Sequence, residues 1–345
     1  MAGVRKQGES VRRFILENIE EHPKDIVTFI SKALGISRQA VNKHVQHLIA
    51  KEILLAEGTT RNRIYGLRPV ARKELIYSLH GLREDVVWRN DIAPIFSDLP
   101  ENVRRIWQYG FTEMLNNAID HSSGSDVFVK INKTAITAEI AIGDDGEGIF
   151  AKIRRELNLD DERHSVLELA KGKLTTDPAH HTGEGIFFTS RMFDRFGIFS
   201  GKTLFLRDDR VLGGRYYCAD EASVPSEGTL VKMRLANNTS RKMKQVFDSF
   251  TSEDDYGFTK TIVPVRLAEY GDEMLISRSQ AKRLLARFDR FRTVMLDFEG
   301  VQTIGQAFAD EIFRVFTQEH TGIMLVEINS NPDVQQMINR ARRHE

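Results

Sequence analysis

Apolar positions in the first part of the chain recur with the period of a helix. Three runs of this kind predict short amphipathic helices, at residues 11–19, 26–33 and 41–48. Residues 53–56 and 63–67 are typical of two strands around a polar tip. From residue 70 to 99 charged and apolar positions are mixed, and we predict a connecting helix or linker. The first domain therefore covers residues 1–69 and is mostly helical.

The same patterning predicts two further domains, at residues 100–240 and 255–345. In the first, we expect helices at 103–119 and 185–193 and strands at 127–132, 136–142, 203–206, 214–218 and 229–235. In the second, we expect strands at 261–268, 273–276, 294–298 and 324–328 and helices at 280–291, 306–319 and 332–343. Ser279 and Asn331 are the expected N-caps of the first and last of those helices. Strands mixed with helices indicate α/β architecture in both domains.

Composition narrows the class of protein. Hydrophobic residues make up 41% and charged residues 28% of the 345 positions, which excludes a wholly disordered chain. The 49 basic and 49 acidic side chains cancel, so the chain as a whole is no polycation. A single cysteine, Cys218, excludes an internal disulfide framework and fits a reducing compartment. Neither a membrane span nor a signal peptide is expected, so we predict a cytoplasmic protein that does not contact membranes.

The first domain has the residues of a DNA-binding surface. Three helices followed by a hairpin is the order of a winged helix, and Ser37 would cap the third helix. If its apolar stripe turns inward, the outward side chains are Arg38, Gln39, Asn42, Lys43 and Gln46, which suit base edges and phosphates. Arg61 and Arg63 lie on the predicted wing, where they would meet backbone phosphate.

Local charge agrees with that interpretation. Residues 1–70 contain 12 Lys+Arg against 7 Asp+Glu, an excess of five positive charges. A winged helix that binds protein instead of DNA is the alternative. His44 and His47 are three positions apart and could hold a metal, but no third ligand is apparent, and solvent-facing or DNA-facing histidines are the simpler interpretation.

Two motifs in the middle domain carry side-chain oxygens that suit a ligand. In the first, Glu113-Met114-Leu115-Asn116-Asn117, the residues Glu113 and Asn117 share a helix face, where they suit Mg²⁺ and a nucleophilic water. In the second, Asp144-Asp145-Gly146-Glu147-Gly148, a carboxylate follows a buried strand and the glycines permit close approach of a ligand ring. A solvent-exposed Asp-Gly turn is the alternative for the second.

Two more motifs follow in the same domain. The sequence His181-Thr182-Gly183-Glu184-Gly185 opens a helix and would expose backbone amides to a phosphate. Thr229, after Gly228, begins the last strand.

In this order and spacing, the four motifs resemble the GHKL superfamily of ATP-binding domains, which includes gyrases, histidine kinases and anti-sigma-factor kinases. The resemblance covers about residues 100–235 and implies the Bergerat α/β sandwich fold. It implies that Glu113 is the general base and that Asn117 coordinates Mg²⁺. It implies that Asp144 binds the amino group of adenine and that Thr229 contacts the adenine through a water molecule. The motif glycines complete the implied ATP site, with Gly146 and Gly148 at the adenine and Gly183 and Gly185 at the phosphates.

The resemblance also implies a lid over the nucleotide. Residues 150–182 would form it, with Lys171, Lys173 and His181 as candidate phosphate contacts. A P-loop and a dinucleotide-binding fold are both disfavoured, because the chain lacks Gly-x₄-Gly-Lys-Ser/Thr and lacks an early Gly-x-Gly-x-x-Gly after a strand.

The third domain resembles the STAS fold of anti-sigma antagonists. The run Leu296-Asp297-Phe298-Glu299-Gly300-Val301 before a loop and a helix carries that resemblance, which is closest to a STAS-like domain of unknown function. The serine that antagonists use as phosphoacceptor falls on Ala307 here, and the nearest hydroxyl is Thr303, so phosphotransfer to this domain is not expected. The helix stripe at Phe308, Ile312, Phe313 and Phe316 is expected to be core. We interpret the domain as an interaction module.

Together these domains predict a prokaryotic regulator. The nucleotide state of the GHKL domain, with bound ATP and Mg²⁺ and with or without slow hydrolysis, would control DNA binding through the STAS-like module. The alternatives are an anti-sigma-type serine/threonine kinase that acts on a separate partner and a nucleotide-gated binding module without turnover. A histidine kinase is disfavoured, because no helix with a phosphoaccepting histidine precedes the ATP domain. A homodimer and a protein partner of the STAS-like domain are compatible with the sequence.

Overall fold

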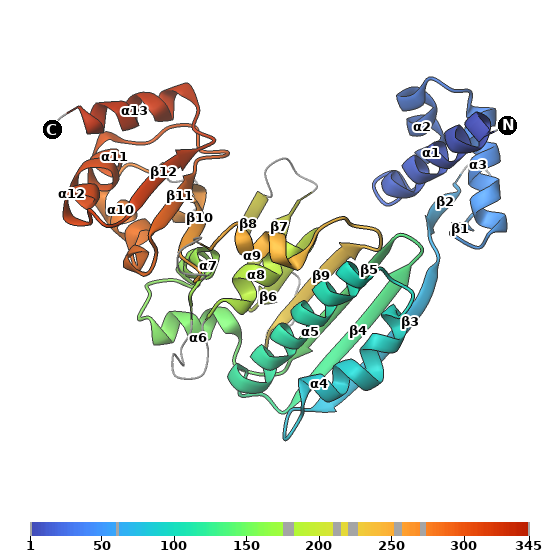
Figure 1. Cartoon of the computed structure of the whole chain (residues 1–345), viewed down its shortest axis with the longest axis horizontal. Coiled ribbons are helices and arrows are strands. Elements are labelled where there is room, and N and C mark those ends of the chain that lie inside the picture. The colour runs from blue at the N-terminus through green and yellow to red at the C-terminus, as the bar shows by residue number, and fades with distance from the viewer. Residues whose placement is uncertain are drawn as a thin grey trace. The chain divides into compact units, whose positions relative to one another are not determined.

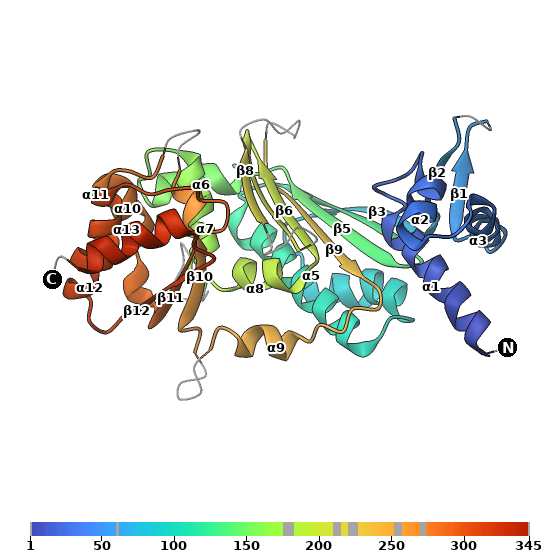
Figure 2. The same ribbon diagram turned by 90° about the horizontal axis from the view of Figure 1, so that it is seen from above.

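The chain forms a multidomain, mixed α/β protein (Figures 1 and 2). The computed structural model describes residues 2–59, 62–174, 183–209, 215–219, 227–251, 257–269 and 274–343. The chain divides into two compact units. The first comprises Met1–Glu74, Lys130–Ile140 and Leu235–Thr239, and the second comprises Leu75–Val129, Ala141–Arg234 and Ser240–Glu345. Among the described residues, no helix has both the length and the apolarity to cross a membrane.

Three helices and a hairpin begin the first unit, as the apolar period predicted. They are α1 (Ala2–Asn18), α2 (Ile26–Leu34), α3 (Arg38–Ala50), β1 (Leu54–Glu57) and β2 (Ile64–Leu67). The core between them is apolar, and Ile15, Ile30 and Val45 are completely buried. Gly35 ends α2 in the left-handed region at φ 64°. The predicted cap of α3 is confirmed, because the Ser37 hydroxyl accepts a hydrogen bond from the Ala40 amide at 3.2 Å.

The segment after this hairpin corrects a prediction. Residues 70–99 were expected to connect by a helix, but β3 is a strand (Pro69–Ser78), and only α4 (Glu84–Val87) and two short turns of π- and 3₁₀-helix, η1 (Trp88–Ile92) and η2 (Ala93–Phe96), follow it. From Ala71 to Ser78 the strand alternates half-buried with exposed side chains, which is the period of a sheet with one exposed face. Because charged residues such as Arg72 and Lys73 fall on both faces, the alternation was hidden in the sequence.

A seven-stranded sheet has the order β3-β4-β5-β9-β6-β7-β8. Its strands after β3 are β4 (Asp126–Thr134), β5 (Thr137–Asp144), β6 (Arg195–Ser200), β7 (Thr203–Asp208), β8 (Arg215–Ala219) and β9 (Leu230–Ala236). Strand β6, which the sequence did not predict, pairs antiparallel with both β7 and β9. The predicted start of β8 at Gly214 lies outside the described residues.

Two predicted helices, α5 (Glu101–His121) and α8 (Gly185–Met192), lie against the same face of β9 and β6 (Figure 2). They pack closely, since a Cβ on Gly110 would stand 2.4 Å from the Phe193 ring. The α5 core residue Trp107 stacks on Phe96 and meets Phe193 edge to face. The sheet and these helices therefore form a layered, mixed α/β arrangement.

The region predicted as a lid, residues 150–182, contains two helices. They are α6 (Ile149–Glu156) and α7 (Glu162–Lys171). The Asp161 carboxylate caps α7 by accepting the Arg163 amide at 2.7 Å. Val166, Leu167 and Leu169 are buried, so α7 is part of the core and not a solvent-exposed loop. Residues 175–182, with the candidate His181, lie outside the described residues.

The C-terminal domain has a parallel sheet of order β10-β11-β12. Its elements are β10 (Lys260–Pro264), η3 (Val265–Ala268), α10 (Arg278–Leu285), η4 (Phe288–Arg290), β11 (Thr293–Asp297), α11 (Gln306–Asp310), η5 (Glu311–Phe316), α12 (Thr317–Glu319), β12 (Met324–Ile328) and α13 (Pro332–Arg342), preceded by α9 (Met243–Asp248). The predicted core stripe is confirmed, because Phe308, Ile312, Phe313 and Phe316 are all buried.

Several details of this domain differ from the prediction. The predicted strand 261–268 ends at Pro264, and Val265–Ala268 form the 3₁₀-helix η3. The cap of α10 is Ser277, not Ser279, because its hydroxyl accepts the Gln280 amide and Gln280 Oε1 accepts the Ser277 amide, which is a capping box. The predicted strand 273–276 is reduced to an isolated bridge at Leu275 among the described residues. The Asn331 cap of α13 is confirmed by a 2.9 Å bond to the Val334 amide.

Candidate functional site

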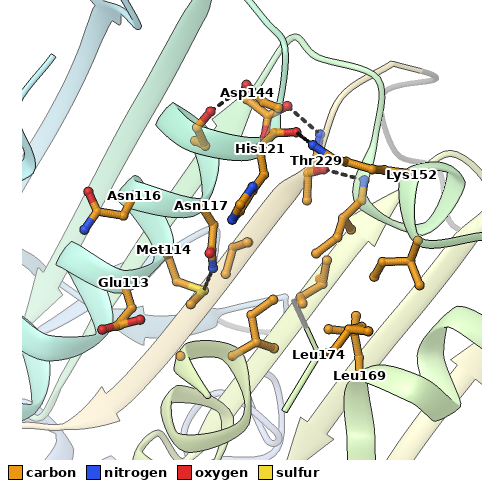
Figure 3. A pocket seen from close by; sticks show the side chains of 18 of the residues that line it. Glu113, Met114, Asn116, Asn117, His121, Asp144, Lys152, Leu169, Leu174 and Thr229 are labelled. Carbon is orange, nitrogen blue, oxygen red and sulfur yellow. Dashed lines mark hydrogen bonds between the residues drawn. The ribbon is translucent and has the colours of Figure 1, made fainter. Parts of the chain in front are cut away.

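A cavity of about 330 Å³ lies within the second unit, between α5, the carboxyl end of β5, α6, α7 and the start of α8 (Figure 3). Seven of the residues that the sequence singled out line it: Glu113, Asn117, Asp144, Gly148, Gly183, Gly185 and Thr229. They come from four separate stretches of the chain. The structure thus brings the predicted motifs together in one place, although Gly146 and Lys173 do not line the cavity.

Asp144 ends β5, and backbone groups hold it in place. Its Oδ1 accepts hydrogen bonds from the amides of Gly146 at 3.0 Å and Thr229 at 3.3 Å. Burial raises the pKa of this carboxyl, and the same two amide bonds act in the opposite direction. Thr229 is fixed in turn, since its hydroxyl accepts the Ile149 amide at 3.0 Å. A half-buried carboxylate therefore faces the cavity in a set orientation.

Close backbone approach explains the glycines beside Asp144. A Cβ on Gly146 would stand 2.0 Å from the Ser122 carbonyl oxygen at the end of α5. A Cβ on Gly228, which has φ 77°, would stand 1.9 Å from the Asp144 carbonyl oxygen. Gly146 therefore does not line the cavity. Its lack of a side chain lets the turn that carries Asp144 pack against the end of α5.

Polar side chains from α5 form the opposite wall. Glu113 and Asn117, four residues apart, both line the cavity (Figure 3). The Asn117 amide nitrogen contacts the Met114 sulfur at 4.0 Å. Gly185 packs directly on Glu113, because a Cβ there would lie 2.1 Å from the carboxylate Oε2. The wall therefore presents a carboxylate and a side-chain amide next to the first residue of α8.

Two ionisable groups in the wall were missed by sequence reasoning. Lys152 lies on α6, and its Nζ donates to the His121 carbonyl oxygen at 2.8 Å. Its position one turn after Gly148 is the signal that could have identified it. Glu184 also lines the cavity; burial raises the pKa of its carboxyl, and the Lys173 charge opposes that shift.

The predicted phosphate contacts Lys171 and Lys173 point elsewhere. Lys171 is 1% exposed, and its Nζ donates to Glu168 at 2.6 Å. Lys173 donates to the Arg290 carbonyl oxygen at 2.9 Å and lies 5.2 Å from the centre of the Phe291 ring. Both amines therefore contact the acidic and aromatic groups around α7 and the C-terminal domain.

The candidate DNA-binding side chains can be placed in the first unit. Arg38, Gln39, Asn42 and Lys43 are exposed along α3, opposite the buried Val41, Val45 and Leu48. Arg63 is exposed beside β2, and Arg61 lies outside the described residues. Within the described parts of the chain, no three histidine, cysteine, aspartate or glutamate side chains are grouped to hold a metal, so His44 and His47 have no third ligand of these types there.

Comparison with known proteins identifies one domain. Residues 280–335 match the family model of the STAS-like domain of unknown function, DUF4325. The match runs from α10 to the start of α13 and includes β11, α11 and β12. None of the curated proteins matches the chain. The C-terminal domain is therefore STAS-like.

Proposed function

We propose that the cavity binds Mg²⁺-ATP and that the protein is an ATP-dependent regulator that acts on DNA. The observation that carries this proposal is the convergence of four motif segments on one cavity of about 330 Å³. That size falls in the range of small-molecule sites, from about 300 Å³ upward. The arrangement supports the GHKL interpretation of the middle domain.

The Asp144 end suits an adenine ring. Two amides hold Oδ1, and we assign Oδ2 to the amino group of the base. Ile142, Ile198 and Val231 supply an apolar lining beside the carboxylate. A planar base with an exocyclic amine satisfies both surfaces.

The α5 end suits phosphates and a divalent cation. Because the Asn117 nitrogen lies toward Met114, its amide oxygen is the atom we assign to Mg²⁺. Glu113 would take a proton from an attacking water, and Lys152 would contribute positive charge. Amides near Gly183 and Gly185 would bind phosphate oxygens. When bound, Mg²⁺ would neutralise charge on the phosphates.

The first unit supports the DNA-binding part of the proposal. Helix α3 presents four polar side chains away from an apolar core, in the manner of a recognition helix. We propose a winged helix that contacts the major groove through α3 and phosphates through Arg63. Mobility shift of the full chain on random-sequence DNA at low salt tests this. We expect binding that Arg38→Ala and Lys43→Ala weaken; absence of binding at low salt would contradict it.

Calorimetric titration with Mg²⁺-ATP tests the nucleotide site. We expect wild type to bind and Asp144→Asn to lose about 100-fold in affinity, as a lost hydrogen bond to a charged group does. Asp145→Asn is the matched control, because Asp145 is exposed and outside the cavity, and it should bind like wild type. Wild type that binds no nucleotide would refute the proposal.

A turnover assay separates the alternatives for the reaction. Release of free phosphate that Glu113→Ala abolishes would indicate an ATPase, and transfer of phosphate to an added protein would favour the kinase alternative.

A further inference from the structure

Helix α7 connects the cavity to the STAS-like domain. Leu169 lines the cavity, while Glu168 and Lys171 on the same helix face the C-terminal domain. Lys171 Nζ donates to the carbonyl oxygens of Arg283 at 3.0 Å and Ala286 at 2.9 Å, as well as to Glu168. The side chains of Glu168 and Lys171 are 6% and 1% exposed, so both charges are withdrawn from water. A buried ion pair of this kind offsets its desolvation cost only where its geometry and its other hydrogen-bond partners are well fixed.

Arg287 of the STAS-like domain completes this network. One guanidinium nitrogen donates to Glu168 Oε2 and the other to the Lys173 carbonyl oxygen, both at 2.7 Å. The Arg287 side chain is 18% exposed, and its Nε has no hydrogen-bond partner within the described part of the chain. Its backbone is left-handed, with φ 65°, a conformation that costs a non-glycine residue about 1–3 kcal/mol. The surrounding contacts hold Arg287 in this conformation despite the cost of its left-handed backbone and of the Nε atom without a hydrogen bond.

The contacts of Arg287 fix the chain where it re-enters the cavity. Thr261 donates to the Lys171 carbonyl oxygen at 2.7 Å, and Arg290 donates to that of Lys173 at 2.8 Å. The next residue, Leu174, lines the cavity, and its amide donates to the Gly183 carbonyl oxygen at 3.1 Å. One peptide unit thus separates the carbonyl that Arg287 holds from the cavity wall.

We propose that Arg287 is a positioning residue for the nucleotide. By bridging Glu168 and the Lys173 carbonyl, it fixes α7 and the Leu174 segment in the shape that receives ATP. The STAS-like domain thereby sets nucleotide affinity from outside the cavity, because a site fixed before binding loses less freedom on binding. Thermodynamic reciprocity requires that nucleotide tighten the contact between α7 and the STAS-like domain by the same factor. The inference rests on the proposed ATP site.

The test is the Kd of Mg²⁺-ATP for full-length wild type, Arg287→Ala, Arg287→Lys and Arg342→Ala. Arg342 is the matched control, since it pairs in the same domain with Glu327 at 2.8 Å and its bond partners lie in that domain. We expect about tenfold weaker binding for Arg287→Ala, within the usual range of coupling between sites. Arg287→Lys keeps the charge beside Glu168 but lacks the fork that reaches two acceptors, so it should fold and still bind more weakly than wild type. Arg342→Ala should bind like wild type.

Amide hydrogen exchange supplies a readout that general destabilisation would not imitate. In wild type, saturating Mg²⁺-ATP should slow exchange at residues 283–290, and in Asp144→Asn it should not. If wild type binds Mg²⁺-ATP and both Arg287→Lys and Arg287→Ala bind it with the wild-type Kd, this inference is overturned and the proposed ATP site is not. Equal weakening by Arg342→Ala would overturn it as well, because the effect would then be one of domain stability. Absence of binding by wild type would overturn the proposed ATP site and, with it, this inference.

Discussion

The Asp144 end of the cavity differs in construction from the region around Glu168 on α7, which we call the α7 end and which lies just outside the cavity wall. At the Asp144 end, backbone amides and glycines hold a single carboxylate. At the α7 end, three charged side chains hold one another: Glu168 lies between the buried Lys171 and the half-buried Arg287. Both ends join residues far apart in the chain, 85 positions from Asp144 to Thr229 and 119 from Glu168 to Arg287. The difference is therefore between backbone and side-chain construction. If the cavity binds ATP as proposed, the backbone-built end would hold the base in a fixed place, whereas the side-chain-built end would let the STAS-like domain adjust the site.

Removal of the central carboxylate should produce the largest effect. Glu168→Ala leaves Lys171 and Arg287 buried without their counter-charge, and we expect the free energy of unfolding to fall by about 3–5 kcal/mol. Urea unfolding followed by tryptophan fluorescence reports on the correct unit, because Trp88 and Trp107 are both buried in it. The control is Asp248→Ala, whose exposed pair with Lys244 should contribute less than about 1 kcal/mol. Equal losses in the two variants would mean that the α7 network is no more important than a surface pair.

This contrast also determines what could be predicted from the sequence. The Asp144 end was predictable, because a glycine pair after an apolar strand and a helix bearing Glu113 and Asn117 carry their geometry in their spacing. Gly146 was singled out as a residue that shapes the adenine pocket, but it supports the wall and does not line the cavity. Helix caps such as Ser37 and Asn331 were predictable for the same local reason.

The α7 end was not predictable. In sequence, Lys171 and Lys173 look like any other lysines near a predicted phosphate site. Only the fold shows that the carbonyl oxygens of Arg283, Ala286 and Arg290 accept hydrogen bonds from their amines. Helix α7 was included in a predicted lid. Its buried residues face a domain more than 100 positions away in the chain, so the local sequence did not show that they are buried. Strand β3 was missed because its alternation is carried by charged residues as well as apolar ones. Long-range contacts therefore overrode the local pattern in α7, whereas charged residues hid the alternation of β3.

A backbone-built end should resist substitution at its supporting glycine. Gly146→Ala would place a Cβ 2.0 Å from the Ser122 carbonyl oxygen, so the turn or the end of α5 must shift. We expect a loss of about 1–3 kcal/mol in stability and about tenfold in Mg²⁺-ATP affinity, since Asp144 moves with the turn. Gly322→Ala is the control, because nothing lies within 4 Å of its added Cβ, and its stability should stay within about 0.5 kcal/mol. If Gly146→Ala bound nucleotide normally, the turn would not be what positions Asp144.

The smallest expected effect is a pH dependence at the α7 end. Burial, and then the Arg283 charge 2.9 Å away, lower the pKa of His164 below its ordinary value of 6.5, while Asp161, Asp160 and Glu168 oppose the shift. The unfolded chain therefore binds this proton more readily than the folded chain, so stability is lost as the pH falls through about 6.5. His164→Gln cannot titrate, and its urea midpoint should fall less than that of wild type between about pH 7.5 and about pH 5.5. Amide exchange at residues 283–290 should rise with acidification in wild type and stay nearly level in His164→Gln. Exchange at residues 283–290 is the readout specific to the α7 end, because burial also raises the pKa of the Asp144 carboxyl at the other end. A parallel fall in wild type and His164→Gln would assign the pH dependence to groups other than His164.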